Sequence, residues 1–347
     1  MQVGVDSFVG AIGGPESAAG ELGALRVQQL LAEVELADRS GVDVIGIGEH
    51  HREEYIASSP VTLLAAAAAR TSRIRLTSAV TVLSSDDPVR VFQQFATLDL
   101  ISQGRAEIVV GRGSFTESYP LFGYDLQHYD ELFSEKLDLL LKLRDETRVH
   151  WQGEHRASLS GQGVWPRPVQ ARLPIRLGVG GTPQSFVRAG VLGLPLTVAI
   201  IGGEAHRFRP LVDLYRQAGE RAGHAPETLD VAVHGIGFLA DTDRAAAETL
   251  YPAHKETFDR IGRERGWPPQ SRATYDAQVS ERGSFFVGSP ETVARKMWAV
   301  SDALGGVSRF TLMISGGTLP HSAMLRSIEL LGTEVRPKVN AAHQVVV

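Results

Sequence analysis

The sequence predicts an α/β protein whose strands close into a (β/α)8 TIM barrel with irregular insertions. Eight short apolar segments of strand character alternate with segments of helical spacing from one end of the chain to the other. No glycine fingerprint opens the first connection between a strand and a helix, which disfavours a doubly wound open sheet. We therefore expect a single barrel domain over residues 1–335, with residues 336–347 as a C-terminal tail.

Each expected strand is a short run of mainly apolar and β-branched residues, as is typical of strands in a buried parallel sheet. These runs span residues 2–8, 42–48, 74–82, 105–110, 175–179, 196–201, 229–239 and 310–314. The segments between them repeat apolar residues at helical spacing, and several begin at a proline, which is favoured in the first turn of a helix. The expected helices span residues 21–39, 60–71, 88–102, 129–146, 183–192, 206–222, 244–265, 290–304 and 321–331.

Two stretches interrupt the alternation of strands and helices. Residues 149–173 contain two Trp, three Gly and two Pro, a composition that predicts an excursion from the barrel such as a small hairpin. Residues 266–289 form a second irregular stretch. Neither has the regular apolar spacing of the neighbouring helices.

The composition excludes several classes of function. The 35 Lys and Arg residues face 40 Asp and Glu residues without long runs of either sign, so nothing indicates binding to nucleic acid or to a membrane surface. The absence of cysteine excludes disulfides, thiolate catalysis and cysteine-based metal sites. No apolar run approaches the length of a membrane span, and the N-terminus lacks the features of a signal peptide. We expect a soluble cytoplasmic protein.

The strongest candidate site is a carboxylate and two imidazoles, Glu49, His50 and His51, directly after an expected strand. Catalytic groups of parallel barrels follow the carboxyl ends of strands, and histidine titrates near neutral pH. Side chains alternate in direction along an extended chain, so one histidine is expected to enter a cavity while the other contacts the scaffold. Adjacent histidines chelate a metal poorly, so we expect acid–base chemistry and no metal.

Two further turns are candidates for holding an anion. Gly180, Gly181 and Thr182 lie between a strand and a helix, where glycines and free backbone N–H groups suit a phosphate, and Ser185 adds a hydroxyl. Capping of the helix by Thr182 is an equally good account of that turn, and residues 315–318 after the last strand are a competing phosphate site. Arg112 stands between two glycines after the fourth strand and could reach a phosphate or a ring system.

These pieces occur together in one family, and the chain resembles the bacterial luciferase-like flavin-dependent monooxygenases along nearly its whole length. The resemblance rests on a set of motifs that keep their order and spacing. They are Gly48-Glu49-His50-His51, Ser78-Ala79-Val80-Thr81-Val82-Leu83, Asp87-Pro88-Val89-Arg90, Leu98-Asp99-Leu100-Ile101-Ser102-Gln103-Gly104-Arg105, Gly111-Arg112-Gly113, the run from Pro174-Ile175 to Ser185, and Gly193-Leu194-Pro195.

The resemblance implies roles for particular residues. It makes His50 the acid–base residue near the reactive edge of the flavin ring, with Glu49 beside it, and it implies a cis peptide between Ala79 and Val80 behind that ring. It also assigns the phosphate of the flavin to one arginine and one turn. These residues are Arg112, Gly180, Gly181, Thr182 and Ser185.

The chain departs from the family pattern in two places. The glutamate that luciferase has at the position of Gly180 is absent, and a second phosphate-contacting arginine is replaced near Tyr129 and Asp130. The phosphate contacts are therefore expected to differ from those of luciferase.

The function that the resemblance implies is oxygenation of a small organic substrate by reduced FMN and O2 through a peroxyflavin. A separate flavin reductase would supply the reduced FMN, an irregular stretch would cover the site, and a homodimer would form through early helices such as residues 60–69. Two alternatives remain open. One is hydride transfer with a deazaflavin coenzyme on the same fold, and the other is a flavin-binding protein without turnover.

Overall fold

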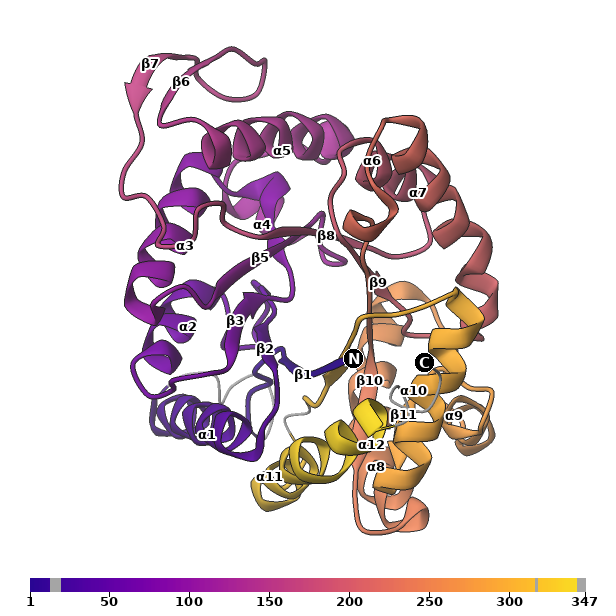
Figure 1. The fold of residues 1–347 in the computed structure, drawn as a ribbon. Coiled ribbons are helices and arrows are strands. Elements are labelled where there is room, and N and C mark those ends of the chain that lie inside the picture. Colours follow the sequence, from indigo (N-terminus) through magenta and orange to yellow (C-terminus); the bar gives the residue numbers. More distant parts are fainter. Residues whose placement is uncertain (13–19, 316–317, 342–347) are drawn as a thin grey trace.

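Eight parallel strands close into a barrel in the structure, a computed structural model that describes residues 1–12, 20–315 and 318–341 (Figure 1). The barrel strands are β1 (Gln2–Ser7), β2 (Val44–Ile47), β3 (Arg75–Ser78), β5 (Ala106–Gly111), β8 (Ile175–Val179), β9 (Leu196–Ala199), β10 (Val231–Leu239) and β12 (Arg309–Met313). Each pairs with the next in this order, and β1 pairs with both β2 and β12, which closes the ring. The predicted barrel is confirmed.

Helices surround the barrel, as Figure 1 shows. They are α1 (Gly20–Ser40), α2 (Pro60–Ala68), α3 (Pro88–Ser102), α4 (Ser118–Leu121), α5 (Tyr129–Asp145), α6 (Pro183–Val191), α7 (Arg209–Arg221), α8 (Asp243–Arg265), α9 (Arg272–Val279), α10 (Pro290–Leu304), α11 (His321–Leu330) and α12 (Arg336–Ala341). Helices α3 and α10 begin and end as predicted because their caps are readable: Asp87 and Ser289 accept backbone N–H groups at the two N-termini. No described helix is long and apolar enough to cross a membrane.

The two irregular stretches differ in the structure. The first contains an antiparallel hairpin of β6 (Arg148–Trp151) and β7 (Leu159–Gly163), as predicted. The second is more regular than expected, since it contains α9 and the short strand β11 (Phe286–Gly288), which extends the sheet beside β10. Another short strand, β4 (Thr81–Val82), pairs with β5.

Residues 336–341 of the expected C-terminal tail form the helix α12. This helix is held by the buried side chain of Val339 and by an ion pair of 2.9 Å between Arg336 and Asp43. The amino group of Met1 also donates to Asn340 at 2.9 Å. A π-helical turn (Leu331–Val335) connects α12 to α11, and residues 342–347 lie outside the described residues.

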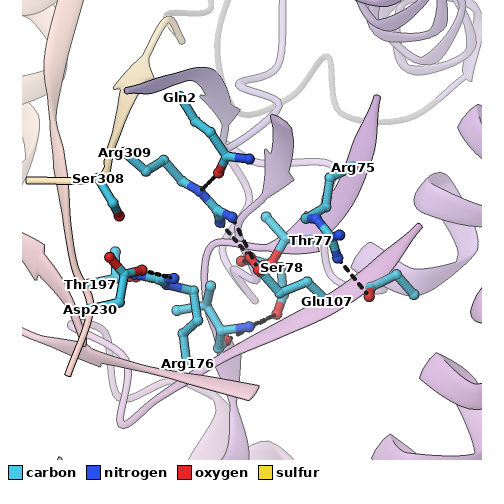
Figure 2. A network of polar contacts seen from close by, with 12 residues as sticks. Gln2, Arg75, Thr77, Ser78, Glu107, Arg176, Thr197, Asp230, Ser308 and Arg309 are labelled. Atoms are coloured by element: carbon cyan, nitrogen blue, oxygen red, sulfur yellow. Dashed lines mark hydrogen bonds and ion pairs between the residues drawn. The ribbon is translucent and has the colours of Figure 1, made fainter. Parts of the chain in front are cut away.

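Charged side chains fill the amino-terminal end of the barrel (Figure 2). They come from the first or second residue of their strands: Arg75 and Arg309 begin β3 and β12, while Glu107 and Arg176 are the second residues of β5 and β8. Because every strand starts at this end, the long side chains meet at the barrel axis and close the amino-terminal end of the barrel. Arg309 also lines the cavity above, so this polar layer forms the cavity floor.

Opposite charges are paired within this floor. Arg309 donates to Glu107 at 2.5 Å and to Gln2 at 2.9 Å, and Arg176 donates to Asp230 at 2.7 Å. Burial alone would raise the pKa of Glu107, but the guanidinium groups of Arg309 and Arg176 outweigh burial and hold that pKa below its ordinary value. The carboxylate therefore stays charged inside the barrel.

The floor generates a stability prediction. Replacing Glu107 by alanine leaves the buried guanidinium of Arg309 without its partner, which should lower the free energy of unfolding by about 3–5 kcal/mol. The double variant E107L/R309M removes both charges and should recover much of that loss. Urea unfolding measures both, with D241A, which breaks the exposed pair Arg326–Asp241, as the control expected to change stability far less. A double variant less stable than E107A would contradict the assignment.

Candidate functional site

A cavity of about 500 Å³ opens at the carboxyl ends of the barrel strands and reaches down to the charged floor. Its lining includes Glu49, His50 and all the residues that the resemblance assigned to the flavin, but not His51. The candidates in the lining are Glu49, His50, Ala79, Val80, Arg112, Gly180, Gly181, Thr182 and Ser185. They come from four different connections between strands and helices, and parallel closure of the barrel brings those connections to one rim. Their individual chemical roles remain predictions.

Glu49 is fixed in place by hydrogen bonds to both of its carboxylate oxygens. It accepts from the ring of His51 at 2.8 Å and from the backbone N–H of Val82 at 2.9 Å. His51 thus contacts the scaffold while His50 lines the cavity, as the alternation of side chains predicted. The carboxylate ties the end of β2 to the segment that follows Ala79 and Val80.

His50 lies among aromatic rings. Its ring centroid is 4.4 Å from that of Phe8, 4.5 Å from Tyr55 and 5.3 Å from Phe115. Its Nε2 is buried and has no hydrogen-bond partner among the described residues. Burial, followed by the positive charges of His51 and Arg52, lowers the pKa of His50 to about 3. The imidazole is therefore neutral at neutral pH and has no proton to donate beyond its single N–H.

The wall between β3 and β5 carries the peptide bond of Ala79 and Val80, which is cis as the resemblance implied. Glycines surround the Val80 side chain because there is no room for a Cβ. A Cβ on Gly111 would lie 2.7 Å from Val80 Cγ2, and one on Gly178 would lie 2.8 Å from Val80 Cγ1. These glycines let Val80 sit flat against the barrel wall, where it lines the cavity.

The anion-binding candidates meet on one side of the rim. Arg112 donates to Asp130 at 2.5 Å and to Ser185 Oγ at 3.2 Å, and its guanidinium lies 5.1 Å from the ring centroid of Tyr129. A Cβ on Gly180 or Gly181 would meet no atom within 4 Å, so open space lies over this turn.

The side chains on this side of the rim are suited to binding an anion. Thr182 is the N-cap residue of α6, yet its side chain makes no capping hydrogen bond, which leaves its hydroxyl free for a ligand. A second cation, Arg188, lies nearby on α6. Burial and then the positive charge of Arg112 lower the pKa of Arg188. The guanidinium of Arg112 and an open glycine turn fit a phosphate.

The competing anion site and the expected cover are elsewhere. Ser315 and Thr318 line a different, smaller pocket, while residues 316–317 lie outside the described residues. Among the described residues, neither 149–173 nor 266–289 contributes to the cavity lining. One trio of possible metal ligands occurs in the described part of the chain, namely His128, Glu131 and His155, and it lies outside that lining.

Sequence reasoning missed two polar side chains of the cavity, Asp6 and His234. Asp6 Oδ2 lies 2.6 Å from His234 Nδ1, although the residues are 228 positions apart. His234 is the one polar residue of the buried strand β10, and Asp6 is the one charged residue of β1; a polar or charged residue in a buried strand was the available signal.

The burial of His50 predicts a dependence of stability on pH. Its folded-state pKa of about 3 lies below the ordinary 6.5, so between these values the unfolded chain binds a proton that the folded protein does not. The free energy of unfolding should therefore fall as pH drops through this window, by up to about 1.4 kcal/mol per pH unit. H50N should lose this contribution, whereas H206N, at an exposed histidine, should keep it. A wild-type-minus-H50N difference that is constant with pH would contradict the assignment.

Known proteins resemble the chain in sequence and in fold. The chain is 28% identical to 4-hydroxyprotoasukamycin monooxygenase from Streptomyces nodosus subsp. asukaensis, over 96% of this chain and 92% of that protein. Among solved structures, it is similar to the oxygenating constituent of 3,6-diketocamphane monooxygenase from Pseudomonas putida in complex with FMN, with a TM-score of 0.77 at 20% identity over 98% of both chains.

The fold is also that of the coenzyme F420 dependent tetrahydromethanopterin reductase from Methanopyrus kandleri, with a TM-score of 0.72 at 19% identity over 97% of this chain and 98% of that one. The family model described as luciferase-like monooxygenase matches residues 4–306, which is most of the chain. The sequence-based prediction of family is confirmed: the chain belongs to the luciferase-like monooxygenases.

Proposed function

We propose that this chain is a monooxygenase that binds reduced FMN and uses O2 to oxygenate a small organic substrate. The observation that carries the proposal is the position of Arg112 beside the open turn of residues 180–182, on the rim of a largely apolar cavity. This arrangement offers a cationic end to a phosphate and apolar walls to a flat ring system. The presence of FMN in the diketocamphane enzyme supports the choice of flavin.

Each residue at the cationic end has a distinct part in this proposal. Arg112 would pair with the phosphate, and the missing side chains of Gly180 and Gly181 would let the phosphate approach the backbone. Thr182 would add its unused hydroxyl. Asp130 now holds Arg112, so a phosphate would have to share or displace that carboxylate.

The other residues would act on the ring system and its surroundings. Bound reduced FMN would supply the electrons that activate O2 for transfer of one oxygen atom. Val80 would support one face of the ring, and Glu49 would hold that segment through Val82. His50, which is neutral, would offer a hydrogen bond or accept a proton. A separate flavin reductase would deliver the reduced FMN.

Two alternatives keep the fold. The F420-dependent reductase supports hydride transfer from a deazaflavin on the same architecture. A flavin-binding protein without turnover is the second alternative. The ordered set of Glu49, His50 and Arg112 at one cavity favours an enzyme, because a carrier needs only the phosphate contacts.

Anaerobic binding of reduced FMN and of reduced riboflavin tests the phosphate assignment directly, since riboflavin lacks only the phosphate. R112Q should weaken the binding of reduced FMN by about 10- to 100-fold, which corresponds to the loss of a charge-assisted hydrogen bond. Its affinity for reduced riboflavin should be unchanged. R272Q, at an exposed arginine outside the cavity lining, is the matched control and should bind both as wild type does. Equal loss of both flavins in R112Q, or no loss of either, would remove Arg112 from this role.

The same titration with the deazaflavin coenzyme separates the alternatives. We expect wild-type protein to prefer reduced FMN over both oxidised FMN and the deazaflavin. Preference for the deazaflavin would replace the oxygenase proposal with hydride transfer. Preference for oxidised FMN would favour the carrier.

We also propose that the chain forms a homodimer through α2 and α3. A groove of about 490 Å³ lies between these helices, and its lining mixes polar side chains with apolar ones such as Val61, Ala65 and Ile101. Ile101 and Trp165, both of the lining, are 46% and 61% exposed, so the groove offers apolar surface to a second chain.

Light scattering on the purified protein tests the dimer. Wild-type protein should have twice the mass of one chain, and I101D should be monomeric because it places a charge in the apolar contact. L121D, at an exposed leucine outside the groove, should remain dimeric. A monomeric wild type, or a dimeric I101D, would exclude this interface.

A further inference from the structure

Asp6 and His234 form a hydrogen-bonded pair in the wall of the cavity. Asp6 is 3% exposed and His234 is 8% exposed, and Asp6 Oδ2 lies 2.6 Å from His234 Nδ1. The ring of Phe8 stacks on the imidazole, with centroids 6.1 Å apart and planes 18° from parallel. A carboxylate and an aromatic ring together fix the orientation of this imidazole.

The pair requires a glycine at position 46, and two buried oxygen atoms beside it lack hydrogen-bond partners among the described residues. A Cβ on Gly46 would lie 2.1 Å from Asp6 Oδ1, so a side chain at position 46 is incompatible with the carboxylate where it stands. Asp6 Oδ1 and Thr311 Oγ1 are buried without a hydrogen-bond partner among the described residues. Such atoms cost about 1–3 kcal/mol each unless a ligand or water satisfies them. Both residues line the cavity, beside His234.

The carboxylate determines which ring nitrogen of His234 is available. In a neutral ring, donation from Nδ1–H to the Asp6 carboxylate makes Nε2 the acceptor nitrogen. Nε2 has no hydrogen-bond partner among the described residues and, unlike Nε2 of His50, is not closed off by protein. An acceptor nitrogen backed by a carboxylate is the arrangement that lets an imidazole take a proton and be stabilised as an imidazolium.

The other titratable side chains of the lining are paired with protein groups, apart from His50. In the described part of the chain, Glu49 accepts from His51 and from a backbone N–H, Arg112 pairs with Asp130, Arg309 pairs with Glu107, Tyr129 donates to a backbone carbonyl, and His50 has a buried Nε2 and a depressed pKa. His234 is therefore the group of this lining that is best placed to exchange a proton with a bound substrate.

The place of His234 in the barrel lets it contact a substrate bound beside the flavin. In the ring of strands, β10 stands across the barrel from β3, and β1 stands across from β8. His234 on β10 therefore faces the segment of Ala79 and Val80 that follows β3, where the flavin is proposed to bind. Asp6 lies closer to that segment, since a Cβ on Gly46 would be 2.1 Å from Asp6 Oδ1 and 2.9 Å from Ala79 Cβ. A substrate between β10 and that segment would contact the flavin on one side and His234 on the other.

We propose that Asp6 and His234 form a general-base pair that ionises a substrate bearing an acidic hydroxyl, such as a phenol or an enol. This inference rests on the proposed function for its place in the reaction. In the step, the O–H bond of the substrate breaks, its proton moves to Nε2 of His234, and its electron pair stays on oxygen. Asp6 balances the imidazolium, and the electron-rich anion that results is the form that attacks an electrophilic oxygen donor.

Ionisation of a coloured phenol tests the pair without flavin or turnover. 4-Nitrophenol absorbs visible light only as the phenolate, so the protein is titrated with it about one pH unit below the pKa of the free phenol. Wild-type protein should bind it as the anion, raising its ionisation constant by about tenfold or more. H234Q and D6N should lose this increase. H254Q, which removes a buried histidine outside the cavity lining, should retain it.

Each other outcome overturns the proposal. Failure of wild-type protein to bind the phenol would exclude the substrate class, and binding without ionisation would exclude the base. Equal ionisation in wild type and H234Q would assign the effect to another group.

Flavin binding separates this proposal from the proposed function. H234Q that binds reduced FMN normally but fails to ionise the phenol supports both assignments. Loss of FMN binding in H234Q would instead make the histidine a flavin contact and contradict its assignment as the base. If wild-type protein ionises the phenol but does not bind reduced FMN, the assignment of the base is supported and the proposed monooxygenase function is contradicted.

Discussion

Pairing of β1 with β12 closes the sheet, and the rest of the structure depends on that closure. Residues Gln2 to Asp6 of β1 run in parallel register with Arg309 to Met313 of β12. Because all eight strands run the same way, their starts meet at one end and their carboxyl ends at the other. The first end is filled with paired charges, and the second is left open as the cavity. One topological constraint thus produces both a sealed floor and a site.

Much of the fold was predictable because its signals are local. The eight strands are short apolar runs, and helices such as α3 and α10 have readable caps at Asp87 and Ser289. Helix α12 was missed because only Val339 of its six residues is buried, so no apolar repeat marks it. It is held instead by Arg336 on Asp43, a contact between opposite ends of the chain. The spacing of apolar residues within a short segment cannot indicate such a long-range contact.

Some residues of the candidate site could likewise be predicted from the sequence, and others could not. Residues that follow strand ends, such as His50 and Arg112, could be nominated because the rim of a barrel is a predictable place. The pair of Asp6 and His234 could not, since its members are 228 positions apart and only closure of the barrel brings them within 2.6 Å. The neutral state of His50 was equally hidden, because it results from burial among Phe8, Tyr55 and Phe115. Sequence identified the candidates, while tertiary contacts determine which can move a proton.

The central claim is that the cavity holds reduced FMN while it reacts with oxygen. The most direct test mixes the anaerobic complex of protein and reduced FMN with O2 in the absence of substrate, and follows oxygen uptake and hydrogen peroxide release together. A site that shields the bound flavin from water should separate the two events, so oxygen should be consumed before peroxide appears. Peroxide released in step with oxygen uptake, as with free reduced FMN, or no oxygen uptake at all, would contradict the account.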